Sequence, residues 1–348
     1  MIKYLKIMHV RKGFRGMNKL LTISVAAYNV ERYIENTLNS LLTEDIDKLE
    51  IIVQDDGGND GTAEIAQRYQ EKYPDSVRLV RKENGGYGST INSSLMIATG
   101  KYFKQLDGDD WFETDNINQL LSVLENNDID VIYTPHYEVH EYKSKKILRR
   151  EFPENLKGSY ALKEVIGLKR WRLVMHSLCF RTELLTSNNI RLLEKCFYTD
   201  SEYSLYPLAY AKDIYICDFP IYNYRLGVEA QSVSAEGRRK HYKDHLEVDK
   251  RLVSFYRSAK RVDKQVKEYV RDCISDICAS GITDYAMVAV PDKGVKREII
   301  SHDIYIKRAA NDIYVDMKRK SKVLNILRKS NYRLYGILAR YKIWRYRK

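Results

Sequence analysis

Residues 101–112 read KYFKQLDGDDWF, an apolar segment that ends in a cluster of carboxylates. This run predicts a strand followed by an acidic turn, in which Gly108 lets the backbone bend. Asp107 and Asp109 have the spacing of an Asp-x-Asp motif, and Asp110 adds a third charge. Because crowded carboxylates repel one another, a bound cation is a natural reason for the cluster, and Mg²⁺ often shares such oxygen ligands with a phosphate. For an isolated motif, a solvated acidic turn is the alternative interpretation.

Strands and helices alternate upstream of this motif. Apolar runs predict strands at residues 20–27, 49–53 and 77–80, and helical patterns predict helices at residues 31–42, 62–72 and 89–98. The alternation indicates an α/β fold with a mainly parallel sheet. Ligands bind at the carboxyl ends of the strands in such sheets. Tyr28, Asp55 and Asp107 all follow strands, so we expect them to converge on one site.

The second half of the chain is less informative. We expect a strand at residues 128–134, a basic ribbon at residues 143–150, and helices at residues 244–256 and 263–279. Gly281 and residues 290–294 are predicted breaks.

Length and composition allow one large domain or two ordinary ones, since the chain has 348 residues and 44% hydrophobic residues. Five cysteines without a Cys-x-x-Cys pair predict free thiols in a reducing compartment. No apolar run reaches the roughly 18 residues of a spanning helix, and residues 1–19 lack the apolar core of a signal peptide. We expect a cytoplasmic protein with a basic extension at 1–19, in which Met17 is an alternative start. A domain at 20–235 follows, with halves at 20–115 and 116–235, and then a helical region at 236–348.

The net charge of +12 is concentrated at the end of the chain. Residues 318–348 contain 12 Lys and Arg and no Asp or Glu, which leaves 47 basic and 47 acidic residues in the rest. The same stretch carries aliphatic and aromatic residues, so it predicts a basic amphipathic helix that suits an anionic membrane surface. A packing helix with a solvated basic face is the alternative. We expect no nucleic-acid partner, because no base-reading module is recognisable.

Five motifs in order along residues 20–235 resemble those of the family 2 glycosyltransferases. They are VAAYNVE at 25–31, DDGGNDGT at 55–62, ENGG at 83–86, ATGKY at 98–102 and DGDDW at 107–111. Ala26 stands where the family usually has Pro, Gly57-Gly58-Asn59 replaces Gly-Ser-Thr, and Ile91 stands where many members have Arg. The resemblance implies a Rossmann-like GT-A domain, whose donor half is followed by an acceptor half. It also implies an inverting enzyme that uses a nucleotide sugar.

The resemblance also implies donor-binding roles. Tyr28 would stack on a uracil ring, Asp56 would accept the base N–H with support from Asp55, and Asp107 and Asp109 would face the ribose and a divalent metal. The metal ligands would be Asp109, Asp107 and Asp110. The full donor set is Ala26, Tyr28, Glu31, Asp55, Asp56, Asn84, Gly85, Gly86, Asp107, Gly108, Asp109 and Arg225. The alternatives are a packed core aromatic for Tyr28 and a helix N-cap for Asp55 and Asp56.

An inverting transfer needs a general base for the acceptor hydroxyl. Residues 197–203 read FYTDSEY, and the resemblance favours Asp200 over Glu202 for this role. Alternatively, Asp200 caps a helix at 201–210. His176 and Trp111 are candidate acceptor contacts, although a lone His is more often structural. Arg225, with residues 231–234, resembles a donor-site loop that pairs with phosphate.

These features together predict a Mg²⁺- or Mn²⁺-dependent hexosyltransferase that uses a UDP-sugar donor. We expect its acceptor to be a lipid-linked saccharide of bacterial capsule, exopolysaccharide or cell-wall polymer synthesis, at the inner face of the membrane. The alternatives are a nucleotidyltransferase or sugar-nucleotide hydrolase, and an inactive membrane-bound module that binds nucleotide sugars.

Overall fold

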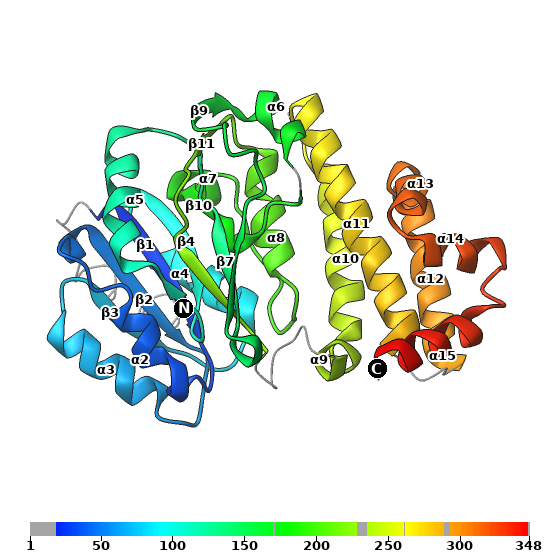
Figure 1. Ribbon diagram of the computed structural model, residues 1–348, viewed down its shortest axis with the longest axis horizontal. Helices are drawn as coiled ribbons and strands as arrows, with labels where there is room; N and C mark the ends of the chain where they lie inside the picture. Colours follow the sequence, from blue (N-terminus) through cyan, green and yellow to red (C-terminus); the bar gives the residue numbers. More distant parts are fainter. Residues whose placement is uncertain (1–18, 170, 228–234, 261, 289–292, 347–348) are drawn as a thin grey trace, which may run out of the picture. The chain divides into compact units, whose positions relative to one another are not determined.

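The computed structural model describes residues 19–169, 171–227, 235–260, 262–288 and 293–346 (Figure 1). The chain forms two compact units, Met1–Gly227 and Val228–Lys348. Most of the expected basic extension lies outside the described residues. Lys19 is buried, and its Nζ donates to the Asp47 carbonyl (2.6 Å). In the described ranges, no helix is both long enough and apolar enough to span a membrane.

The first unit is built on an eight-stranded sheet of order β3-β2-β1-β4-β10-β6-β11-β9. Four neighbouring strands pair in parallel: β1 (Leu21–Ala27), β2 (Leu49–Asp55), β3 (Val77–Arg81) and β4 (Tyr102–Asp107). The other half contains β10 (Leu178–Arg181), β6 (Val131–Tyr133), β11 (Asp213–Ile216) and β9 (Gly158–Ala161), where β10 and β9 run antiparallel to their neighbours. The expected α/β fold with a mainly parallel sheet is therefore confirmed.

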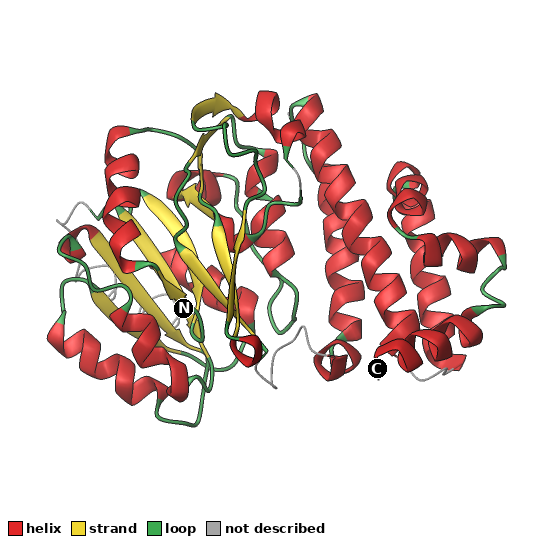
Figure 2. Ribbon diagram, in the orientation of Figure 1, coloured by secondary structure: helices red, strands yellow, loops and turns green. Residues whose placement is uncertain are grey.

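Helices connect the parallel strands, as Figure 2 shows. They are α2 (Glu31–Asn39), α3 (Thr62–Lys72), α4 (Tyr87–Ile97) and α5 (Thr114–Asn126). Side chains from β1 and β2 such as Ile23, Val25 and Ile51 are fully buried, because helices cover both faces of a parallel sheet. This explains why these strands read as continuous apolar runs.

A second sheet, of order β5-β12-β7-β8, follows the acidic motif. Its strands are β5 (Trp111–Phe112), β12 (Tyr222–Leu226), β7 (His136–His140) and β8 (Lys145–Arg149). The pairing of β5 with β12 brings Asn223 opposite Trp111. The acidic turn between β4 and β5 is thereby held beside residues more than 100 positions away in sequence.

Three predicted elements are shorter than expected. The helix expected at 31–42 is α2, which ends at Asn39. The helix expected at 201–210 is α8 (Asp200–Leu205) followed by a 3₁₀ turn (Pro207–Ala209). Proline lacks the backbone N–H that an α-helix needs, so the helix ends before Pro207. The strand expected at 128–134 contracts to β6.

The second unit is helical. It contains α9 (Ala235–Lys240), α10 (Tyr242–Ser258), α11 (Lys264–Val288), α12 (Lys293–Ala309), α13 (Asn311–Lys320), α14 (Lys322–Lys329) and α15 (Tyr335–Tyr346). The break predicted at Gly281 is wrong, because α11 continues through it. A Cβ on Gly281 would lie 2.6 Å from His245 Cε1, so this glycine allows close packing of α10 rather than ending a helix. Residues 290–292 of the other predicted break lie outside the described residues.

A buried ionic cluster joins three of these helices. Asp249 of α10 is fully buried; its Oδ2 lies 3.0 Å from His302 Nε2 of α12, and its Oδ1 lies 3.3 Å from His245 Nδ1. Cys278 of α11 also interacts with the Asp249 carboxylate. A buried carboxylate with such partners contributes to helix packing, because removal of a partner would leave a charge without compensation.

Candidate active site

The strand register brings the predicted site residues to one edge of the sheet. Ala27 lies opposite Asp55, and Ala26 lies opposite Asp107. The carbonyl of Ala26 also accepts a hydrogen bond from the Gly108 N–H (2.9 Å). A Cβ on Gly108 would lie 2.8 Å from that carbonyl oxygen, so glycine is needed for this close approach. The acidic turn is thus fixed against the end of β1.

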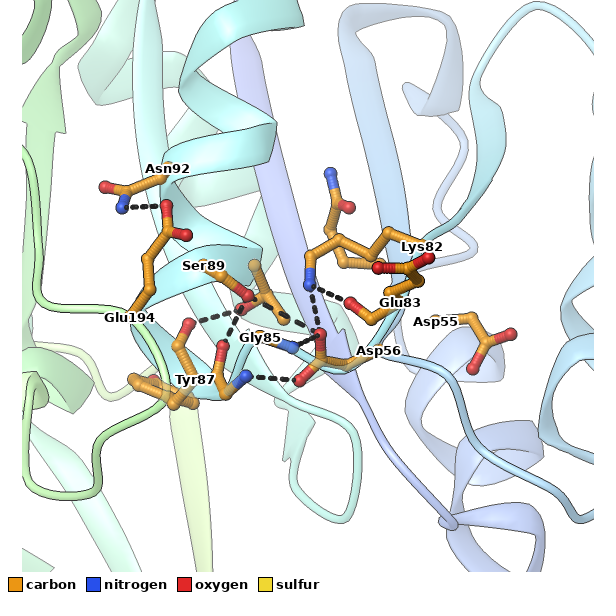
Figure 3. A network of polar contacts seen from close by, with 12 residues as sticks. Asp55, Asp56, Lys82, Glu83, Gly85, Tyr87, Ser89, Asn92 and Glu194 are labelled. Atoms are coloured by element: carbon orange, nitrogen blue, oxygen red, sulfur yellow. Dashed lines mark hydrogen bonds and ion pairs between the residues drawn. The ribbon is translucent and has the colours of Figure 1, made fainter. Parts of the chain in front are cut away.

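Asp56 holds the Gly85-Gly86 turn, as Figure 3 shows. Its carboxylate accepts hydrogen bonds from the N–H groups of Gly85 (3.0 Å) and Gly86 (2.8 Å), and Lys82 forms an ion pair with it. Gly86 has a φ of +76°, a conformation that glycine adopts readily. Asp56 therefore shapes the loop before α4 and does not cap α3, whose N-cap is Gly61.

Tyr28 directly follows β1, and Asp55 is the last residue of the neighbouring strand β2. The Tyr28 side chain is 52% exposed, so the alternative of a packed core aromatic is wrong. Asp55 is buried, and its Oδ1 accepts from the Gly58 N–H (3.1 Å). Asn84 is exposed. Glu31 is also exposed, and its carboxylate accepts from the Gly61 N–H (2.9 Å), so it ties together the loops that follow β1 and β2.

Asp110 is a buried carboxylate rather than a solvated one. It is 1% exposed, and it accepts hydrogen bonds from the Tyr222 hydroxyl (2.7 Å) and the Arg225 N–H (2.7 Å). Burial, followed by the charge of Asp109, raises the pKa of Asp110 well above its ordinary value. The same two causes raise the pKa of Asp107 to about 8. The turn therefore stores charge repulsion that a cation would relieve.

His176 joins this pair of carboxylates. Asp107, Asp110 and His176 each offer a ligand atom, and these atoms lie within 4.8 Å of one another. Burial lowers the pKa of His176 well below its ordinary value, so the ring is neutral and has a free lone pair. His176 Nδ1 and Asp107 Oδ1 are both buried and have no hydrogen-bond partner in the described part of the chain. Such a donor set fits a divalent metal ion.

Residues that sequence reasoning missed hold the His176 ring in place. The ring stacks on Tyr224 (centroids 4.2 Å apart) and on His136 (5.3 Å). The buried Lys104 donates from Nζ to the carbonyls of His176 (2.8 Å) and Leu178 (3.2 Å). The only sign of this arrangement in the sequence was a lysine, Lys104, in the middle of an apolar strand. Sequence analysis placed the metal on the three aspartates, whereas the geometric group contains His176 and does not include Asp109.

Arg225 and Trp111 lie together beside the acidic turn. The guanidinium carbon of Arg225 lies 4.7 Å from the ring centroids of both Trp111 and Tyr33. Its Nε donates to the Asp109 carbonyl (2.7 Å), and it forms an ion pair with Glu141. Arg225 thus supports the turn in this structure, and its pairing with phosphate stays a prediction. Residues 231–234 lie outside the described residues.

Asp200 and Glu202 have different surroundings in α8. Glu202 is fully buried, and its carboxylate accepts from the Leu193 N–H (2.7 Å) and the Tyr206 hydroxyl (2.9 Å). Asp200 is partly exposed at the first residue of the helix. Its charge contributes to the raised pKa of Asp107, so the two carboxylates lie near each other. Asp200 is thus the more exposed of the two carboxylates, and its role as the base stays a prediction.

Hydrogen bonds hold the loop before Asp200 against α4. Asn92 of α4 accepts from the Leu192 N–H (2.9 Å) and donates to the Leu192 carbonyl (2.9 Å). A Cβ on Gly88 would lie only 2.1 Å from the Leu193 carbonyl oxygen. The Lys195 N–H donates to the Gly85 carbonyl. Contacts thus run from the Gly85-Gly86 turn directly to the segment that positions Asp200.

Sequence comparison shows that this chain is similar to glycosyltransferases. The model of the glycosyl transferase family 2 matches residues 22–186. The uncharacterized glycosyltransferase EpsJ of Bacillus subtilis is 29% identical over 219 residues, which are 60% of this chain and 62% of EpsJ. The hyaluronan synthase of Pasteurella multocida is 30% identical over 138 residues, 39% of this chain and 14% of the synthase. This chain therefore spans less than two thirds of these relatives.

Solved structures share the fold. S. aureus TarS 1-349 in complex with UDP-GlcNAc matches 86% of this chain and 89% of its own length, with a TM-score of 0.55 and 17% identity. The mannosyltransferase PcManGT from Pyrobaculum calidifontis, in complex with GDP-Man and Mn²⁺, matches 98% of this chain and 94% of its own length, with a TM-score of 0.50 and 15% identity. Residues 22–186 of this chain therefore form a family 2 glycosyltransferase domain, and the chain has the GT-A fold.

Proposed function

We propose that this protein moves a sugar, with inversion, from a nucleotide-sugar donor to an acceptor hydroxyl in bacterial polysaccharide synthesis. The observation that carries the proposal is the Asp107–Asp110–His176 group, in which Asp110 is buried, near Asp200 at the strand ends. A divalent cation held by this group, next to the partly exposed Asp200, would suit displacement of a diphosphate leaving group.

We propose a UDP-sugar as the donor. The half-exposed Tyr28 directly follows β1, and Asp55 ends the neighbouring strand β2, an arrangement that suits stacking on a uracil ring and recognition of its N–H. The other residues expected at the donor, Asn84, Gly85 and Gly86, form the adjacent turn that Asp56 holds. A TarS structure of the same fold contains UDP-GlcNAc, whereas PcManGT contains GDP-Man, so a GDP-sugar is the competing donor.

Asp107, Asp110 and His176 would hold a Mg²⁺ or Mn²⁺ ion, with Asp109 as a further oxygen donor. When bound, such an ion offsets the negative charge that develops on the departing diphosphate. The protein residues prepare this site: Lys104 fixes the His176 backbone, and Tyr222 bridges the Asp107 N–H (3.1 Å) to the Asp110 carboxylate. Because His176 belongs to this group, its role as an acceptor contact is the weaker assignment.

Asp200 would serve as the base. The acceptor oxygen forms a bond to the anomeric carbon while the bond to the diphosphate oxygen breaks, and the hydroxyl proton passes to the Asp200 carboxylate. Glu202 is less suited, because both its oxygens already accept hydrogen bonds inside the fold. Trp111 stays a candidate acceptor contact, since aromatic faces stack on sugar rings.

We further propose a lipid-linked saccharide as acceptor, with the enzyme bound peripherally to the inner face of the membrane. The concentration of positive charge in residues 318–348 supports this location. The alternatives give different products: a nucleotidyltransferase would release pyrophosphate, a hydrolase would release free sugar, and an inactive module would bind UDP with metal and turn nothing over.

Asp200→Asn tests the proposed reaction. We expect transfer to fall by at least about 100-fold, because loss of a general base typically costs that much, while binding of UDP with Mn²⁺ is retained. Asp218→Asn is the matched control, since Asp218 is an exposed aspartate that pairs with Lys157 at the surface and is not among the candidate site residues. Wild-type rates of glycoside formation by the folded Asp200→Asn protein would contradict the assignment.

A further inference from the structure

The exposed face of α14 combines cations with an aliphatic side chain. Lys322, Ile326 and Lys329 are exposed and follow one another at spacings of four and three residues, so they share one helix face. Ile326 is 42% exposed. Leu324 and Leu327 are fully buried on the other side. The helix therefore packs by its leucines and leaves an isoleucine between two lysines in solvent.

The same pattern continues through the turn into α15. Arg333, Leu334, Ile337 and Arg340 are exposed, whereas Tyr335 and Ala339 are buried. Ile337 is 66% exposed and Leu334 is 39% exposed. We call the exposed residues of both helices the basic-aliphatic surface: Lys322, Ile326, Lys329, Arg333, Leu334, Ile337 and Arg340. It corrects the prediction of a single amphipathic helix at 318–348, because two helices and a turn supply it and part of the apolar content is core.

The cations of this surface differ from their neighbours. Lys320 pairs with Asp272, and Arg328 pairs with Asp303, so the basic residues that face inward have carboxylate partners. Lys322, Lys329, Arg333 and Arg340 form no ion pair with any residue of the described ranges. Residues 318–348 contain no acidic residue. The surface thus presents positive charge that its own segment does not neutralise.

An anionic lipid surface matches both properties at once. Lipid headgroups attract Lys and Arg, and aliphatic side chains enter the boundary between headgroups and acyl chains. Exposure of three large aliphatic residues among cations is unfavourable in water. A nucleic acid would bind the cations through its phosphates but would not contact the aliphatic residues. We infer that the basic-aliphatic surface docks on anionic phospholipid. The inference rests on the proposed function, because docking on the membrane would bring the enzyme to a lipid-linked acceptor.

Sedimentation with vesicles tests the inference on the full chain. Binding is expected to vesicles of phosphatidylglycerol and phosphatidylcholine, to weaken as salt rises, and to be lost on pure phosphatidylcholine. Ile326→Glu with Ile337→Glu should abolish sedimentation with the anionic vesicles. Val315→Glu is the matched control, because Val315 is 47% exposed on α13 beside the acidic residue Asp316, and it should bind like wild type.

A second double variant distinguishes loss of lipid binding from loss of folding. Lys329→Gln with Arg333→Gln changes only exposed cations, and it should weaken the partition coefficient by about fivefold for each charge removed. Equal binding of wild type and both double variants would overturn the inference, and so would a failure of wild type to bind anionic vesicles. Dimerisation of wild type that Ile326→Glu with Ile337→Glu removes, without vesicle binding, would instead assign the surface to self-association and also overturn it. Release of UDP from the donor in solution should be unchanged in these variants, so failure of the docking surface and failure of the proposed reaction are distinguishable.

Discussion

Substitution of Gly88 by Ala should disturb the loop that carries the proposed base. Gly88 is the second residue of α4, and the added Cβ would lie 2.1 Å from the Leu193 carbonyl oxygen. A carbon and an oxygen in ordinary contact stay more than about 3 Å apart, so the loop must move by roughly 1 Å. Overpacking of this kind costs about 1–3 kcal/mol in the free energy of unfolding.

The displacement should reduce catalysis more than stability. The loop leads to Asp200 within a few residues, and Asn92 holds Leu192 by two hydrogen bonds that cannot both follow the movement. A misplacement of about 1 Å can lower the rate about 100-fold when a catalytic group loses its alignment. We expect kcat to fall to this extent, while the affinity for UDP falls by a smaller factor, because the displacement reaches the donor residues Gly85 and Gly86 indirectly, through Lys195.

Urea unfolding and nucleotide release measure the two effects. Gly167→Ala is the control, since a Cβ at Gly167 meets no atom within 4 Å, and it should match wild type in both assays. Equal free energies of unfolding and equal rates of UDP release for Gly88→Ala and Gly167→Ala would show that the loop tolerates the added Cβ and would contradict this prediction.

Two further predictions concern charge. Burial raises the pKa of Asp107 to about 8, so the carboxyl is protonated below that pH and a metal ion must displace the proton. The affinity for Mn²⁺ should therefore fall as the pH drops below about 8 and level off above it, which electron paramagnetic resonance can follow. A pH-independent affinity would contradict this. Burial acts to raise the pKa of Asp249, but His245 and His302 lower it overall. The stability that the ionised Asp249 contributes to the fold is therefore complete above the unfolded pKa of about 4 and is lost as the pH falls further. Asp249→Asn should therefore lose about 3 kcal/mol at pH 7 in urea unfolding followed by circular dichroism, and an unchanged midpoint would show that the cluster contributes nothing.

The sequence predicted those parts of the fold that depend on local pattern. The strands ending at Ala27, Asp55 and Asp107 were recognisable because apolar runs stop at polar loops, and parallel register then brings their ends together. Helix α3 was placed correctly at both ends. These features need only neighbours in sequence.

Long-range pairing produced what the sequence did not show. His176 reaches Asp107 and Asp110 because β10 pairs with β4, and no spacing rule encodes that contact. Tyr222 enters the site because β12 pairs with β5. Gly281 looked like a helix break, although its lack of a side chain serves helix packing. In each case tertiary contact decided the role of the residue.

The central claim is that the aspartate-histidine group serves a nucleotide-sugar transfer. The most direct measurement is a panel of UDP- and GDP-sugars tested with Mn²⁺, with Mg²⁺ and with chelator, read by thermal shift and by release of the free nucleotide. We predict that one UDP-sugar raises the melting temperature and releases UDP only with metal, and that Asp107→Asn abolishes the response. Equal binding and release in the presence of chelator, or no response of the folded protein to any nucleotide sugar, would contradict it.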